Sequence, residues 1–167
     1  MTPAALLSDG FQRIVDSGTA VVDGLDADDL AFRPGPEANS IAWLVWHLTR
    51  VQDDHVAEVA AREQVWVARD FVDRFALPLD AADTGYGHSA EQVGQVRAPA
   101  DALAAYLIAV HEGTLAFLDT VGEADLDRVV DERWDPPVTL GVRLVSVLDD
   151  CARHVGQAEY VRGLLHP

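Results

Sequence analysis

Three polar side chains from two distant segments of the sequence have the types and the spacing of a metal site. Asp150 and His154 are four residues apart near the end of the chain, and His47 lies in a much earlier segment. Residues four apart share one face of a helix, so a single rigid face can present a carboxylate and an imidazole together. Two imidazoles and one carboxylate bind zinc, and three protein ligands leave a fourth position open for water or substrate. The pattern predicts a tridentate divalent-metal site of the open, catalytic type.

The helical periodicity of both segments determines where these side chains point. At about 100° per residue, His154 falls inside the apolar arc of the last segment and Asp150 falls at its margin. That arc consists of Leu140, Leu144, Val147, Leu148, Cys151, Val155 and Ala158. His47 flanks the apolar stripe of the earlier segment, which consists of Ile41, Leu44, Leu48, Val51 and Val59. We therefore expect all three side chains to face the interior, where a carboxylate needs a cation, a donor or water.

An alternative interpretation of these residues needs no metal. His154 can be a core histidine that hydrogen-bonds to Asp150 or Gln157, and His47 can be satisfied in the same way near Asp54. An aspartate and a histidine four residues apart are common on helices. The spacing alone does not show that the two segments face each other.

Apolar residues recur with a helical period almost throughout the chain, and no segment of any length alternates like a strand. The periodicity predicts four long helices, at residues 3–22, about 40–63, about 99–121 and about 140–165. Between the second and third, it predicts a short helical piece at residues 68–75, a break at Pro78 and a glycine-rich loop. These elements indicate one all-α domain over residues 1–167, a four-helix bundle with elaborated connections. Such long connections are suited to building a site.

The composition excludes several classes of function. The chain has 28 acidic and 12 basic residues, and every basic residue is arginine. Its surface therefore repels nucleic acids and anionic membranes, and no lysine is present to form a Schiff base. No apolar run approaches the roughly 20 residues of a membrane span, and the N-terminal residues do not resemble an export signal. The single cysteine, Cys151, excludes an internal disulfide, so we expect a cytoplasmic protein.

The two segments that carry the candidate ligands resemble the DinB/YfiT-like superfamily of metal-binding four-helix bundles, and the resemblance covers most of the chain. It rests on NSIAWLVWHLTRVQDDHV (residues 39–56) and LVSVLDDCARHVGQAEYVRGLL (residues 144–165). Members have a W-x-x-x-H-L pattern in the first, here Trp43 and His47, and a ligand pair four apart in the second, here Asp150 and His154. The commoner ligand set is three histidines. The branch of mycothiol-dependent maleylpyruvate isomerases has glutamate at the position of Asp150, so a carboxylate there is compatible with the site.

This resemblance implies an enzyme that transfers a thiol or uses one to assist an isomerisation. The implied cosubstrate is mycothiol or bacillithiol, and the other substrate is a small electrophile. A thiol in the open position of a zinc site loses its proton near neutral pH and becomes a strong nucleophile. Zinc is the expected ion, with nickel or another divalent metal as the alternative. Homodimers are also implied.

Residues near the ligands are candidates for the surrounding pocket. Trp43 and Arg143 lie one turn or more from the ligands and are candidates to line it, and Gln157 is a candidate to orient His154. Two other functions stay open at this point. One is a non-catalytic bundle that binds a metal or ligand or forms dimers, and the other is a metal-dependent hydrolase that uses water in place of the thiol.

Other polar or aromatic residues are assigned structural roles. Cys151 lies in the apolar arc and is expected to fill the core, and His55 is expected to be a satisfied core or interface histidine. Glycines in the loop GYGHS, residues 85–89, are expected to form a turn. Trp134 is expected to anchor its loop over a helix end. The acidic pair Asp53 and Asp54 is expected to be solvated, with Asp54 as a candidate partner of His47.

Overall fold

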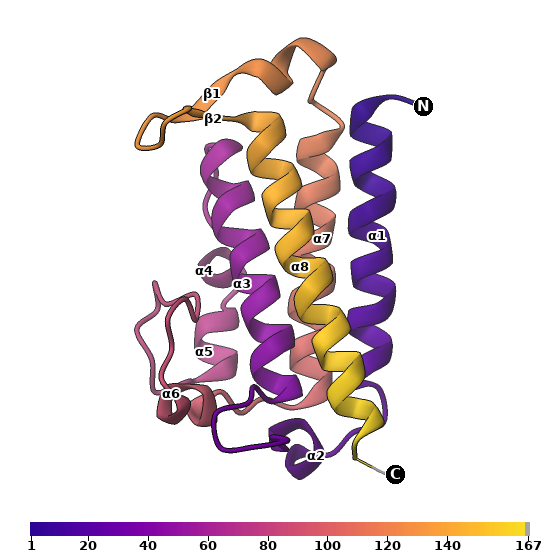
Figure 1. Cartoon of the computed structure of the whole chain (residues 1–167), viewed down its shortest axis with the longest axis vertical. Coiled ribbons are helices and arrows are strands. Elements are labelled where there is room, and N and C mark those ends of the chain that lie inside the picture. Colours follow the sequence, from indigo (N-terminus) through magenta and orange to yellow (C-terminus); the bar gives the residue numbers. More distant parts are fainter. Residues whose placement is uncertain (166–167) are drawn as a thin grey trace.

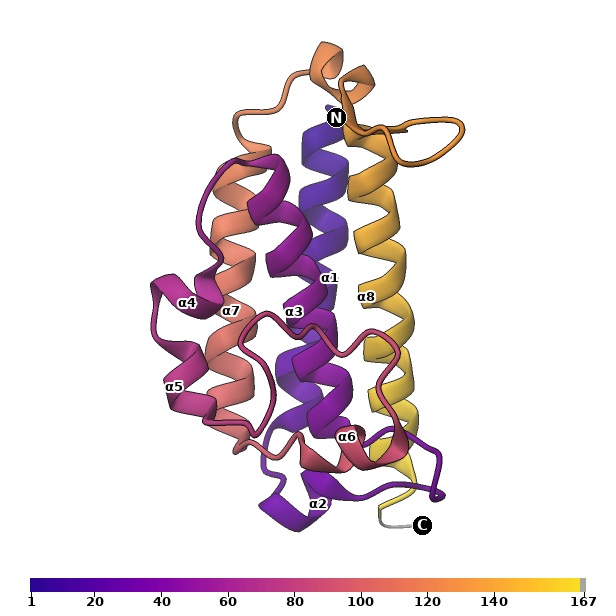
Figure 2. The same ribbon diagram turned by 90° about the vertical axis from the view of Figure 1, so that its left-hand side faces the viewer.

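The structure, a computed structural model, describes residues 1–165, which form a bundle of four long helices (Figures 1 and 2). These helices are α1 (Pro3–Val22), α3 (Ile41–Val59), α7 (Ala100–Leu118) and α8 (Leu140–Gly163). Helix α3 packs against α8 and α7, and α1 packs against α7 and α8, so the four enclose one apolar core. The predicted all-α four-helix bundle is confirmed.

Polar side chains cap three of the four long helices, whereas α7 follows Pro99 and has no side-chain cap. Ser40 Oγ accepts a hydrogen bond from the Trp43 amide at 3.1 Å, which caps α3. The end of α3 is earlier than the expected residue 63. Ala61 adopts a left-handed conformation with φ of 51°, and the Arg62 amide donates to the Ala57 carbonyl at 3.0 Å, a pattern that closes a helix C-terminus.

The connection between α3 and α7 crosses the outer face of α3. Residues 60–99 contain three short helices, α4 (Val65–Ala68), α5 (Phe71–Phe75) and α6 (Ala90–Gln95), where the sequence predicts one piece. Between α5 and α6 the chain extends over α3 toward α8 (Figure 2). The remaining short helix, α2 (Ala27–Ala31), lies at the same end of the bundle as α6 (Figure 1).

The connection between α7 and α8 is more regular than the sequence indicates. It contains a 3₁₀ helix, η1 (Glu123–Asp127), and two strands, β1 (Val129–Asp131) and β2 (Val138–Thr139). The strands pair antiparallel, with Val129 opposite Thr139 and Asp131 opposite Val138. The sequence gives no signal for these strands, because strands of two or three residues are too short to produce an alternating pattern. The hairpin lies beside the first turn of α8 (Figure 1).

A buried ion pair lies between α3 and the connection that follows it. Arg50 and Asp53 are both fully buried, so the prediction that Asp53 is solvated is wrong. The Asp53 carboxylate accepts hydrogen bonds from the amides of Val65 and Trp66, at 2.9 and 2.8 Å, and from the Tyr106 hydroxyl at 2.9 Å. These bonds fix the start of α4 against the bundle.

Helix α7 is more apolar than predicted, because the sequence was expected to contain no apolar run near the length of a membrane span. Among residues 1–165, it is the one helix that meets the length and composition expected of a membrane span, with a mean hydropathy of 1.3. Half of it is buried inside the bundle, as in a core helix of a globular protein. One such helix is weak support for a membrane span.

Candidate metal centre

The three predicted ligands lie together between α3 and α8. One ligand atom from each of His47, Asp150 and His154 lies within 4.8 Å of the other two. His154 Nε2 is 3.6 Å from Asp150 Oδ1, and the two imidazole centroids are 4.8 Å apart. His47 is buried, whereas Asp150 and His154 are partly exposed. Two facing helices thus bring two imidazole nitrogens and a carboxylate oxygen close together.

Both histidines of the cluster have Nδ1 engaged by an acceptor oxygen. His47 Nδ1 lies 2.5 Å from the Thr84 carbonyl oxygen, and His154 Nδ1 lies 2.8 Å from Gln157 Oε1. Because a carbonyl oxygen only accepts, each Nδ1 carries a hydrogen, and in the neutral form of each imidazole Nε2 keeps its lone pair. Histidines that bind metals usually donate their other ring N–H to such an oxygen. Gln157 therefore occupies the position that the sequence reading assigned to it, beside His154.

Asp150 has a carboxylate oxygen without a partner. Its Oδ2 is buried and forms no hydrogen bond with any group in residues 1–165. A buried carboxylate oxygen without a donor is unfavourable, and a cation beside it removes this penalty. The donor set therefore fits a divalent ion such as zinc. The three ligand atoms are up to 4.8 Å apart, whereas the ligand atoms of tetrahedral zinc are about 3.4 Å apart. The side chains must therefore move slightly toward one another to bind an ion.

The protonation of these groups depends on burial and on their neighbours. Burial lowers the pKa of His47, although its hydrogen bond to the Thr84 carbonyl opposes this, so His47 is neutral and able to bind a metal. For His154, burial disfavours the charged form, but the bonds with Asp150 and Gln157 outweigh it and raise the pKa. Burial likewise opposes ionisation of Asp150, but His154 outweighs it and lowers the pKa of the carboxyl.

The loop that carries the Thr84 carbonyl is held by a buried arginine. Arg50 Nε donates to the Asp83 carbonyl at 3.1 Å, and Arg50 Nη2 lies 3.5 Å from the Ala81 carbonyl. Thr84 follows directly in the chain. Arg50 thus fixes the loop that crosses α3, and the loop places the Thr84 oxygen against the imidazole of His47.

Gly85 is required where this loop passes over the ligand. Its φ of +90° lies in the region that favours glycine, which confirms the turn predicted for residues 85–89. A Cβ atom at this position would lie 2.8 Å from His47 Nδ1, 2.9 Å from the Trp46 ring and 3.2 Å from the Trp43 ring. Both the backbone conformation and the close approach therefore exclude a side chain.

Trp43 packs against the imidazole ring of His47. Its ring stacks on His47 with centroids 4.5 Å apart and planes 15° apart, and its Nε1 donates to His88 Nδ1 at 3.0 Å. His88 Nε2 in turn lies 2.9 Å from the Asp83 carboxylate. Trp43 is buried and does not line the cavity described next, although the sequence reading made it a candidate for the pocket wall.

A cavity of about 660 Å³ opens beside the cluster. Its walls come from α3, α8, the loop before α6 and the hairpin, and include His47, Val51, Asp54, His55, Thr84, Tyr86, Asp131, Arg133, Trp134, Val138, Arg143, Ser146, Val147 and Asp150. Tyr86 and Trp134 are 92% and 65% exposed at its rim. Trp134 was predicted to pack over a helix end, but its side chain is mostly exposed at the rim of the cavity.

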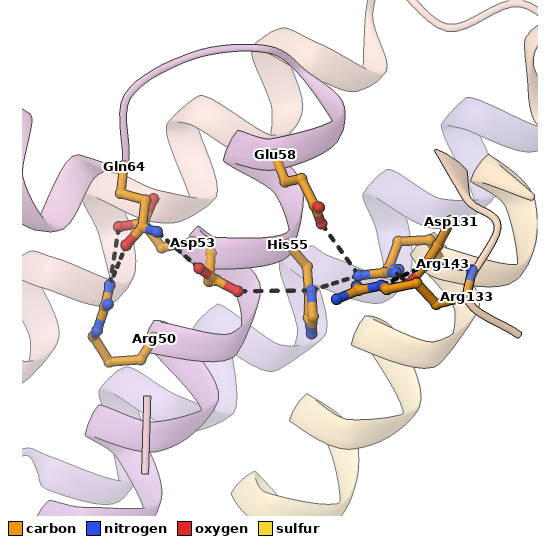
Figure 3. Close-up of polar contacts among 9 residues, drawn as sticks. Arg50, Asp53, His55, Glu58, Gln64, Asp131, Arg133 and Arg143 are labelled. Carbon is orange, nitrogen blue, oxygen red and sulfur yellow. Dashed lines mark hydrogen bonds and ion pairs between the residues drawn. The ribbon is translucent and has the colours of Figure 1, made fainter. Parts of the chain in front are cut away.

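Arg143 lines the cavity as the sequence predicts and is held by a row of polar contacts (Figure 3). Its Nη2 donates to Asp131 at 3.0 Å, and its Nη1 lies 3.4 Å from Glu58 and 2.7 Å from His55 Nδ1. His55 is part of the cavity wall, with a side chain 36% exposed, so of the two predicted places, the core or an interface, it occupies the interface between α3 and α8. Its position two turns after His47 on the same helix was a signal for this role.

Of two further predictions, the one for Asp54 is wrong and the one for Cys151 is confirmed. Asp54 does not bind His47: its carboxylate accepts from Gln64 Nε2 at 2.8 Å and lies 3.8 Å from His55. Cys151 is fully buried, and this burial raises the pKa of its thiol, which confirms its place in the core.

Comparisons with known proteins agree with this fold. The family model described as mycothiol-S-transferase matches residues 6–167. A conserved protein from Enterococcus faecalis, known from its crystal structure, is 31% identical, with a TM-score of 0.92. The similarity covers 99% of this chain and 98% of that chain. No curated protein sequence matches significantly.

Proposed function

Because this chain belongs to the mycothiol-S-transferase family, of the DinB/YfiT-like type, we propose that it transfers mycothiol or a similar small thiol to an electrophilic small molecule. A divalent metal ion, with zinc as the first candidate, is held by His47, Asp150 and His154. The observation that carries this proposal is that all three side chains offer a free donor atom at the same place. Nδ1 of each histidine is engaged by an oxygen, which leaves Nε2 for a metal, and a buried oxygen of Asp150 has no hydrogen-bond partner.

The chemistry of the site follows from its charge. When bound, the ion lowers the pKa of a thiol, so that the reactive thiolate forms near neutral pH. The chain contributes one carboxylate and two neutral imidazoles, so the site keeps a net positive charge with a divalent ion in place. Such a site favours a thiolate over the neutral thiol.

The nucleophilic sulfur must come from a cosubstrate. Cys151 is the single cysteine of the chain, and it is fully buried with a raised pKa, whereas a reactive cysteine needs exposure and a lowered pKa. The cavity of about 660 Å³ is large enough for a small thiol and its partner, since ligand cavities measure about 300–1,000 Å³. Thr84 and Gln157 orient the two imidazoles, and the stacked ring of Trp43 excludes water from one face of His47.

Metal analysis and a coupled activity assay test this proposal. Purified protein should contain one divalent ion per chain, and His47→Ala should lose it. With mycothiol present, the loaded protein should conjugate an electrophile such as monochlorobimane, and the reaction should stop without the thiol. Failure to bind a metal under any loading condition contradicts the proposal, and ester hydrolysis without a thiol would favour the hydrolase alternative.

The location and the oligomeric state belong to the same proposal. A cytoplasmic location is supported by the family's use of a reduced thiol and by the absence of a cysteine pair in the sequence. The homodimer implied by the resemblance stays a prediction, and light scattering of the purified protein measures it.

A further inference from the structure

His55 shares the cavity with the candidate metal centre but takes no part in it. It lies eight residues after His47 on α3, which corresponds to about 12 Å along the helix. Its side chain is 36% exposed and, together with His47 and Asp150, lines the cavity of about 660 Å³. The proposed metal chemistry leaves its function open.

The contact with Arg143 determines which nitrogen of His55 carries the proton. Arg143 Nη1 lies 2.7 Å from His55 Nδ1. A guanidinium only donates and does not lose its proton in proteins, so Nδ1 must be the acceptor. The hydrogen of the neutral imidazole is therefore on Nε2, which forms no hydrogen bond with any group in residues 1–165.

Arg143 is fixed in the position that this contact requires. It is 8% exposed, and its second terminal nitrogen donates to Asp131 at 3.0 Å. Asp131 is held in turn by Arg133, with a bond of 2.8 Å from the terminal nitrogen. Figure 3 shows this row of contacts from the hairpin across α8 to His55. A guanidinium bound on two sides keeps the imidazole in one orientation.

The free nitrogen of His55 points into the space between α3 and α8. In Figure 3 the ring lies between the two helices, with one nitrogen toward Arg143 and the other directed away from it, on the side of the N-terminal half of α3. Burial lowers the pKa of His55 and Arg143 lowers it further, whereas the carboxylates of Asp54, Glu58 and Asp150 oppose this. His55 is therefore neutral at neutral pH.

We propose that His55 donates a hydrogen bond from Nε2 to the carbonyl oxygen of the electrophile, and that the substrates are compounds with a carbonyl group conjugated to the carbon that reacts. A neutral imidazole is an effective donor to a carbonyl oxygen. The cationic donor on Nδ1 polarises the ring and makes the Nε2–H a stronger donor. His55 is then a catalytic residue and Arg143 a positioning residue. This inference rests on the proposed thiol transfer.

The step balances without a change in the protonation of His55. The thiol loses its proton to water, and its sulfur forms a bond to the carbon that is β to the carbonyl group. The electron pair of the carbon–carbon double bond moves, so that the carbonyl oxygen becomes an enolate oxygen, whose charge the Nε2–H stabilises. A proton from water at the α-carbon completes the thioether. His55 keeps its proton throughout.

Two electrophiles that differ in the acceptor oxygen test the role of His55. We expect His55→Leu to lower kcat/KM with mycothiol and methyl vinyl ketone about 100-fold, and to leave the reaction with allyl bromide, which has no oxygen, unchanged. The matched control is His111→Leu, since His111 bonds to Gln12 outside the cavity. This control should leave both rates unchanged. Equal losses for the two electrophiles in His55→Leu, or no loss for either, overturn the inference.

Nitrogen-15 spectra of the histidines test the same role without catalysis. In the wild-type protein, the His55 proton should be on Nε2, and its signal should shift saturably with butan-2-one, the saturated analogue of the ketone. A proton on Nδ1, or no response to butan-2-one, overturns the inference. If the wild-type protein transfers the thiol to neither electrophile, the proposed function fails, and these spectra alone decide the role of His55.

Discussion

Replacing Gly85 by alanine should disturb the candidate metal centre although none of the three ligands is substituted. The new Cβ would lie 2.8 Å from His47 Nδ1 and 2.9 Å from the Trp46 ring, closer than carbon atoms approach without displacement. The left-handed backbone costs a non-glycine residue about 1–2 kcal/mol, and overpacking of a tight site adds about 1–3 kcal/mol. We expect Gly85→Ala to lower the free energy of unfolding by about 2–5 kcal/mol.

The same substitution should weaken metal binding, because His47 is pushed from the Thr84 carbonyl that orients it. Loss of such an orienting partner typically lowers metal affinity about 10–100-fold. Competition with a chelator of known affinity measures this change, and urea unfolding of the metal-free protein measures the stability.

Gly87→Ala is the matched control. Gly87 also has a positive φ, +73°, but nothing lies within 4 Å of the Cβ that alanine would add. The control should therefore show only the backbone strain of about 1–2 kcal/mol and no change in metal affinity. If both variants lose the same stability and bind the metal equally well, the close approach of Gly85 to His47 is not what positions the ligand.

Three further predictions follow from other groups near the cavity. Asp150→Asn should lower metal affinity at least about tenfold in the chelator competition, because it removes the one carboxylate charge among the candidate ligands. Unchanged affinity would remove Asp150 from the ligand set. Cys151 should resist iodoacetamide in the native protein and react in denaturant, and rapid alkylation of the native protein, followed by mass spectrometry, would contradict its burial. The bonds from Arg133, and then the charge of Arg143, hold the pKa of Asp131 well below its ordinary value. The ionised carboxylate therefore stabilises the fold above about pH 4, and this contribution is lost as the pH falls further. Asp131→Asn should flatten the decline of Tm below that pH, and an unchanged profile would show that these bonds do not stabilise the fold.

The frame of the fold was predictable because it depends on a regular pattern. Each long helix repeats apolar residues with a helical period over about five turns or more. In α3 a capping residue, Ser40, also marks the start. The candidate ligands were predictable for the same reason. Asp150 and His154 share one face of α8 by their spacing, and His47 flanks the buried stripe of α3.

What surrounds the ligands could not be predicted, because it depends on contacts between distant segments. Thr84 acts through its backbone carbonyl, which every residue has, so its type carries no signal. Asp53 reads as a surface carboxylate, and only the folded chain brings the amides of Val65 and Trp66 to it. The partner of His55 was not predictable, because a helical projection gives the direction of His55 on α3 but not the position of Arg143 on another helix.

An X-ray absorption spectrum of the zinc-loaded protein, with anomalous diffraction at the zinc edge, measures the metal centre most directly. We predict one ion between α3 and α8, bound by Nε2 of His47, Nε2 of His154 and an oxygen of Asp150 at about 2.0–2.2 Å, with a further ligand from solvent or thiol. An ion bound elsewhere, histidine ligation through Nδ1, or no ion at all in this position would contradict the proposed site and the thiol chemistry that depends on it.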